Sequence, residues 1–187
     1  MITVQRVTHE AELGAIRALQ SANLRKHVSD TEASDQGFLI AEYSVEFLRQ
    51  MHACHPSIIA LDGDQLAGYA LAASRKVRSG HPLLEDLCKQ IDGLSYRHRR
   101  LGDANYVVVG QLCVAKRYRG KGLVQRMYQL FRESLQTHYE YCVTDIARAN
   151  PRSLQAHLKT GFQVIHSIQF EGLEWNVVLW DWSEAQR

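Results

Sequence analysis

The sequence lacks several features that would point to a particular class of protein. Its 187 residues contain no apolar run near the roughly 20 residues of a membrane-spanning helix. The N-terminus lacks the basic stretch and long apolar core of a signal peptide. Basic residues number 22 and acidic residues 20, so the formal charge of +2 does not by itself argue for nucleic acid. No repeat or low-complexity linker divides the chain. We therefore expect a single domain over residues 1–187, with no membrane or nucleic-acid partner.

Clustered metal ligands and paired cysteines are also missing. The cysteines are widely spaced and form no Cys-x-x-Cys pair: Cys54, Cys88, Cys113 and Cys142. Reduced thiols in a cytoplasmic protein are the simplest interpretation. His52 and His55 could share a helix face, but no further ligands accompany them. We interpret them as ordinary helix residues and expect no bound metal.

What the chain does contain is an alternation of strand and helix patterns. Alternating or continuous apolar residues predict strands at 2–7, 57–61, 66–73, 105–114, 141–147, 162–170 and 175–182. Apolar residues at helical spacing predict helices from a cap at Thr8 to about His27, and over 43–54, 82–91, 120–137 and 151–160. Residues 28–37 are polar and predict a loop. Together these patterns indicate an α/β fold in which helices flank one sheet.

The connection from residue 75 to residue 104 is too long for an ordinary link between strands and is interpreted as an insertion. It holds seven basic and four acidic residues. Its run Arg97–Arg100 reads first as a solvated face or loop. A sharper hypothesis is that the insertion covers a substrate site and favours an anionic substrate.

The turn Arg117-Tyr118-Arg119-Gly120-Lys121-Gly122 carries the strongest chemical signal. It joins a buried strand to a helix, and the first N–H groups of a helix point outward without acceptors inside the helix. Such a turn can bind an anion, because glycines let a phosphate approach the backbone. It is not a dinucleotide fingerprint, since Gln125 replaces the third glycine, and not a P-loop, since Gly122 follows Lys121. A solvated turn with chance glycines is the alternative.

Two segments together resemble one known family. Arg117-x-x-Gly120-x-Gly122 resembles the Gln/Arg-x-x-Gly-x-Gly/Ala signature of the GCN5-related N-acetyltransferases, and residues 150–162, NPRSLQAHLKTGF, resemble that family's second coenzyme motif. The order of strands and helices agrees over almost the whole chain, except for the insertion. The resemblance implies a mixed, mostly antiparallel central sheet flanked by helices, with a V-shaped opening that holds acetyl-CoA.

The same resemblance implies which residues touch the coenzyme. Backbone groups of Leu112, Cys113 and Val114 would pair with the pantetheine arm. The pyrophosphate would lie on the turn formed by Arg117, Arg119, Gly120, Lys121, Gly122, Leu123 and Val124, and further contacts would come from Asn150 and Ser153. The reaction implied is transfer of the acetyl group to a primary amine by direct attack on the thioester.

The acid–base residues depart from the family pattern. His157 stands where a tyrosine often protonates the departing thiolate, and we hypothesise that a protonated His157 is the general acid. A helix residue that simply packs beside the coenzyme is the alternative. Gln111 stands near the position of a frequent glutamate base and cannot accept a proton. Glu42, His52, His55 or a water chain could replace it, and spacing singles out none of them.

The acceptor stays unnamed at this stage, although a small molecule is expected. An acyl-CoA-binding sensor or interaction module without catalysis is the second hypothesis, because Gln111 removes a carboxylate. Strands near the C-terminus could pair between subunits and so give a homodimer.

Overall fold

A computed structural model of the chain describes residues 1–170 and 172–183. Its central feature is a seven-stranded sheet in the order β1-β2-β3-β6-β7-β9-β8. The strands are β1 (Ile2–Arg6), β2 (Ile58–Asp62), β3 (Gln65–Ala73), β6 (Tyr106–Val114), β7 (Tyr141–Ala147), β8 (Gln163–Phe170) and β9 (Leu173–Asp181). Every neighbouring pair is antiparallel except β6 and β7, which are parallel. The expected mixed, mostly antiparallel sheet is confirmed.

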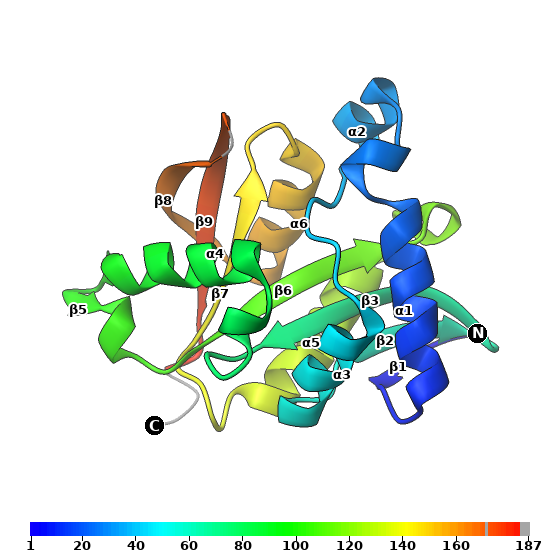
Figure 1. Cartoon of the computed structure of the whole chain (residues 1–187), viewed down its shortest axis with the longest axis horizontal. Helices are drawn as coiled ribbons and strands as arrows, with labels where there is room; N and C mark the ends of the chain where they lie inside the picture. The colour runs from blue at the N-terminus through cyan, green and yellow to red at the C-terminus, as the bar shows by residue number, and fades with distance from the viewer. Residues whose placement is uncertain (171, 184–187) are drawn as a thin grey trace.

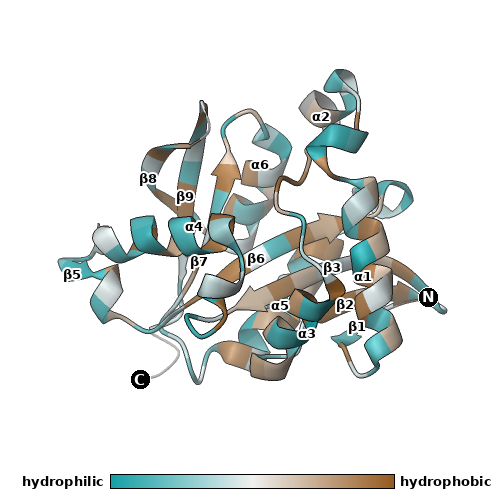
Figure 2. Ribbon diagram, viewed as in Figure 1, coloured by the Kyte–Doolittle hydropathy of each residue, from teal (hydrophilic) through white to brown (hydrophobic). Residues whose placement is uncertain are grey.

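Helices cover both faces of this sheet (Figure 1). The larger ones are α1 (Glu10–Ala22), α2 (Asp30–Gln36), α3 (Val45–Cys54), α4 (Pro82–Gly93), α5 (Leu123–Leu135) and α6 (Pro151–Thr160). Apolar residues of α1, α3 and α4 pack against one face of the sheet, and those of α5, with Leu154 of α6 and Phe162 just after it, pack against the other. Figure 2 shows the same division, with hydrophobic strands inside and hydrophilic outer helix surfaces. Within the described residues, no helix is long and apolar enough to cross a membrane.

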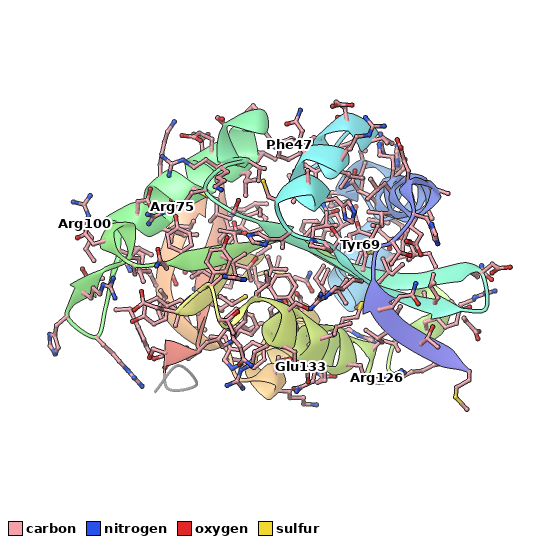
Figure 3. The ribbon with its side chains drawn as sticks, turned by 90° about the horizontal axis from the view of Figure 1, so that it is seen from below. Phe47, Tyr69, Arg75, Arg100, Arg126 and Glu133 are labelled. Carbon is pink, nitrogen blue, oxygen red and sulfur yellow. The ribbon has the colours of Figure 1, made fainter. Side chains whose placement is uncertain are left out.

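Alternation along the strands explains this division into two faces. Successive strand residues point to opposite sides of a sheet. In β7, Val143 packs under α4 while Cys142 packs under α5. Figure 3, seen from below, shows Phe47 and Tyr69 between the helices and the sheet, while Arg126 and Glu133 lie on the outer side of α5.

The N-terminal third of the chain differs from the sequence prediction in two places. The first helix ends at Ala22 rather than near His27, and residues Arg25–His27 form a short 3-10 turn. The expected loop at 28–37 contains α2, which begins where the Ser29 side chain accepts a hydrogen bond from the Glu32 N–H. This short helix of mostly polar residues has no apolar periodicity, so the hydrophobic pattern could not reveal it.

The segment predicted as an insertion is part of the core. Residues 75–104 form α4 and a short hairpin of β4 (Ser95–Tyr96) and β5 (Arg99–Arg100). Leu84, Cys88 and Ile91 of α4 are buried against the sheet. Arg97 and His98 form the hairpin turn with positive φ angles of 45° and 66°. The run Arg97–Arg100 is therefore a surface hairpin, as first expected, while α4 closes one face of the sheet.

Candidate functional site

A cleft opens where the two parallel strands of the sheet separate. β6 and β7 pair only over Tyr106–Val108 and Tyr141–Val143. At the next position, the Thr144 hydroxyl donates to the Val109 carbonyl at 3.0 Å. The β3–β6 register then skips Gly110, and such a bulge bends a strand away from its neighbour. The edge of β6 beyond Val109 is left facing a cleft of about 760 Å³.

The glycine turn forms one end of this cleft. Gly120 and Gly122 have φ angles of 78° and 71°, and Gly122 is the residue before the first turn of α5. The helix begins at Leu123 rather than at Gly120 as predicted. Positive φ at both glycines turns the backbone so that the first N–H groups of α5 face the cleft. The site can therefore hold an anion by backbone dipoles alone.

The basic side chains of this turn do not all reach the cleft. Arg119 lines it, but its guanidinium donates to the Val114 carbonyl at 3.0 Å and to Asn23 Oδ1 at 2.7 Å. Arg117 and Lys121 do not line it, and their cationic groups lie 4.6 and 5.2 Å from the centre of the Tyr118 ring. These side chains brace the turn.

The second motif forms the facing wall. Asn150 precedes α6, and its side chain accepts a hydrogen bond from the Ser153 N–H at 3.2 Å. Pro151 occupies the first turn, where no backbone donor is needed. The structure brings the predicted coenzyme residues together, and the following ones line the cleft: Leu112, Cys113, Val114, Arg119, Gly120, Gly122, Leu123, Val124, Asn150 and Ser153.

Comparison with known proteins agrees with this geometry. A sequence model of the Acetyltransferase (GNAT) family matches residues 25–162, which is most of the chain. This chain belongs to the GNAT family. No curated protein sequence matches it significantly.

Solved structures share the GNAT fold at low sequence identity. A putative acetyltransferase of Salmonella typhimurium, solved with its cofactor acetyl-CoA, is 15% identical with a TM-score of 0.64, and the match covers 98% of this chain and 95% of that one. A ribosomal-protein-alanine N-acetyltransferase from Brucella melitensis is 17% identical with a TM-score of 0.62, covering 96% and 99%. A chain of the NatC complex bound to Gag peptide and CoA is 14% identical with a TM-score of 0.66, covering 96% and 98%.

His157 lies in the α6 wall of this GNAT cleft, but its surroundings do not favour a cation. Burial lowers the pKa of its imidazole to about 4. Nδ1 lies 2.8 Å from the Ser153 carbonyl, so it carries the hydrogen, and Nε2 lies 2.6 Å from the Tyr128 hydroxyl and accepts from it. These partners and the lowered pKa favour a neutral imidazole, and the role of His157 as general acid stays a prediction.

Gln111 is the centre of a buried amide network. Its Oε1 accepts from Gln20 Nε2 at 2.9 Å and from the Tyr69 hydroxyl at 2.6 Å, while its Nε2 donates to the Ala41 carbonyl at 2.8 Å. Gln20 in turn accepts from the Tyr43 N–H at 2.9 Å. Gln111 thus joins β6 to α1 and to the segment before α3, and both polar atoms of its side chain are engaged in this network.

The replacement bases named from the sequence lie outside the cleft. Glu42 accepts from Arg17 and Lys26, each at 2.5 Å, and these hydrogen bonds lower the pKa of its carboxyl group. His55 Nε2 lies 2.6 Å from the Tyr139 hydroxyl. Neither of these residues nor His52 lines the cleft. In the described part of the chain, no group of three or more His, Cys, Asp or Glu side chains is arranged to hold a metal ion.

Asp145 also lines the cleft and is not among the residues predicted from the sequence. Asp145 is a half-buried residue of β7. It lies two residues after Val143, the last residue of β7 that pairs with β6. Burial raises the pKa of its carboxyl group to about 6. The available signal was one acid inside the otherwise uncharged strand Tyr141–Ala147. Burying a carboxylate in such a strand costs free energy unless the carboxylate is paired or hydrogen-bonded. An unpaired acid in a cleft is therefore a candidate functional group.

The α4 helix supplies an uncharged wall. Leu83, Leu84, Leu87 and Gln90 line the cleft. The arginines of the hairpin instead pair at the surface, Arg97 with Asp181 at 3.0 Å and Arg99 with Glu140 at 2.7 Å. The segment 75–104 borders the cleft, but its lining residues give no reason for an anionic substrate, and its role as a cover of the acceptor site stays a prediction.

Proposed function

We propose that this chain is an acetyl-CoA-dependent N-acetyltransferase that moves the acetyl group to a primary amine of a small molecule. The observation that carries the proposal is the fork between β6 and β7. It leaves an unpaired strand edge beside a helix N-terminus, in a cleft large enough for a coenzyme and a compact acceptor. Membership of the GNAT family supports the same reaction class.

The coenzyme would lie along the open edge of β6. Its amide-containing pantetheine arm would pair with the backbone of Leu112–Val114 as an added strand does. Its pyrophosphate would accept from N–H groups between Arg119 and Val124, with Asn150 and Ser153 further along. Arg117 and Lys121 would contribute charge from outside the cleft, because their side chains pack over Tyr118.

For direct transfer, the protein needs to hold the amine beside the thioester and to supply a hydrogen-bond donor for the carbonyl oxygen. Holding amine and thioester together replaces a bimolecular encounter. A backbone N–H of Leu112–Val114 would donate to the carbonyl oxygen as negative charge builds on it. His157 stays in the proposal as a neutral part of the wall beside the leaving sulfur, rather than as a proton source.

Two measurements separate this proposal from its alternative. Calorimetry should show acetyl-CoA binding, and a thiol reagent should detect CoA release when a suitable amine is added. Tight binding without release, across aryl, alkyl and polyamine acceptors and peptide N-termini, would favour an acyl-CoA sensor. Absence of binding would refute both. The free cysteines support our prediction that the protein acts in the cytoplasm. We also propose a homodimer that forms through the edge strand β8. Sedimentation would test this homodimer.

A further inference from the structure

Asp145 is the one acidic residue among the described residues that line the cleft. Its partner in the β7–β9 ladder is Val177, which belongs to the core beneath α4. Residues on both sides of it, Thr144 and Ile146, therefore face the α5 side. Asp145 accordingly lies at the mouth of the fork on the α4 face, opposite the glycine turn and α6.

The cleft residues on the α4 face are apolar or uncharged. Leu83, Leu84 and Leu87 line the cleft from α4, and Ile168 and Trp175 line it from β8 and β9. Tyr43 faces it from the segment before α3, with its hydroxyl donating to the Gly110 carbonyl at 2.9 Å. In the described part of the chain, no cationic side chain forms an ion pair with Asp145.

The remaining charges lie on the other side of the fork. The cationic residues that line the cleft are Arg119 in the turn and Arg152 and Lys159 on α6. Burial keeps the other nearby titratable groups neutral: it raises the pKa of Tyr43 and of the Cys113 thiol and lowers that of His157. The cleft thus has a basic end suited to coenzyme phosphates and, across the fork, a lone acid in an apolar pocket.

We propose that Asp145 binds the ammonium group of the acceptor and takes its proton, and that the leucines of α4 select an amine on a compact apolar body. This inference rests on the proposed function. A lone carboxylate in an apolar pocket is stabilised by a cation that enters with its own apolar group. A polyamine would leave further ammonium groups against leucine side chains, so it should be a poor acceptor.

The proton inventory of the step balances. Asp145 takes one proton from R–NH₃⁺, and the neutral nitrogen forms a bond to the thioester carbon while an electron pair moves to the carbonyl oxygen. Collapse of this intermediate breaks the C–S bond. The thiolate takes the second proton from nitrogen, which gives the amide and CoA–SH, and Asp145 later releases its proton to water. The raised pKa of about 6 suits a base that works near neutral pH.

The test compares Asp145→Asn with Asp86→Asn, the same change on α4 outside the cleft lining. Acceptors are 2-phenylethylamine, n-hexylamine and spermidine. We expect the wild-type protein to prefer the first two by at least about tenfold in kcat/KM. Asp145→Asn should lower kcat/KM for 2-phenylethylamine by roughly 100-fold, and acetyl-CoA affinity by calorimetry should stay within about twofold. Asp86→Asn should match wild type.

The pH profile separates a base from a merely structural residue. Wild-type kcat/KM should fall below pH 6 as Asp145 becomes protonated, and Asp145→Glu should keep such a limb while Asp145→Asn loses it. A wild type that binds acetyl-CoA but acetylates no amine would refute the proposed function itself. A wild type that acetylates amines while Asp145→Asn retains its rate and its acid limb would refute only the role of Asp145. Preference for spermidine would refute the apolar acceptor.

Discussion

Gln111 shows how a single buried amide can join the elements that wall the GNAT cleft. Replacing it with glutamate keeps the shape but turns the group that donates to the Ala41 carbonyl into an acceptor. We expect Gln111→Glu to lower the free energy of unfolding by about 2–4 kcal/mol at pH 8. Burial raises the pKa of such a carboxyl group, so the loss should shrink as pH falls toward 5. Urea denaturation at both pH values measures this, with the exposed Gln50→Glu as control.

His157 gives a second prediction at the level of one residue. Its folded pKa of about 4 lies below the usual 6.5, so the unfolded chain binds more protons between these values and His157 costs stability as pH falls through that window. His157→Gln removes this cost and also the Nδ1–H that donates to the Ser153 carbonyl. We expect the free energy of unfolding of the variant to be lower than that of wild type at pH 7, by on the order of 2 kcal/mol. Urea denaturation at pH 7 and pH 4.5 should show that this difference is smaller at pH 4.5. A difference in free energy of unfolding that grows as the pH falls would contradict a neutral, buried imidazole.

At the level of elements, the turn before α5 combines a conformational demand with a binding role. Gly122 and Gly63 have similar positive φ angles, 71° and 60°, and a Cβ on either would meet open space. Alanine at each should therefore cost about 1 kcal/mol of stability. Only Gly122→Ala should also weaken acetyl-CoA binding, by at least about tenfold, because it redirects the first N–H groups of α5. Calorimetry and denaturation of both variants measure this, and equal acetyl-CoA affinities would contradict the anion site.

These elements also show which parts of the site were accessible from sequence. The turn at 117–122 and the helix after Asn150 are local structures set by glycines, a cap and a proline, so the sequence could predict them, and the resemblance to the GNAT motifs joined them into one site. β7 and α6 were found with the bounds that the structure gives them. The partners of Gln111 are Gln20, Ala41 and Tyr69, which lie 42 to 91 residues away in sequence. Such contacts depend on tertiary packing, as does the place of Asp145 at the fork, and no periodicity records them.

Across the whole molecule, the two faces of the sheet have different roles in our proposal. The α5 and α6 side carries the phosphate-binding turn and the basic residues of the cleft, and the α4 side carries Asp145 among leucines. The fork connects the two sides, so coenzyme and acceptor can approach the same point from opposite faces. This arrangement makes α4 both a wall of the acceptor pocket and a cover for the core.

That double role gives a prediction about the segment 75–104. If it were only an insertion, replacing it with a short turn would leave a folded protein with altered acceptor preference. Because Leu84, Cys88 and Ile91 are buried against the sheet, we expect the deletion variant instead to lose cooperative thermal unfolding and its near-ultraviolet circular dichroism. The control changes only the hairpin tip. His98→Gly suits the positive φ angle of 66° there and keeps the Arg97–Asp181 ion pair, so it should raise stability by about 0.5–1 kcal/mol, with no effect on acetyl-CoA affinity. A deletion variant that unfolds cooperatively and binds acetyl-CoA normally would show that α4 is dispensable to the core.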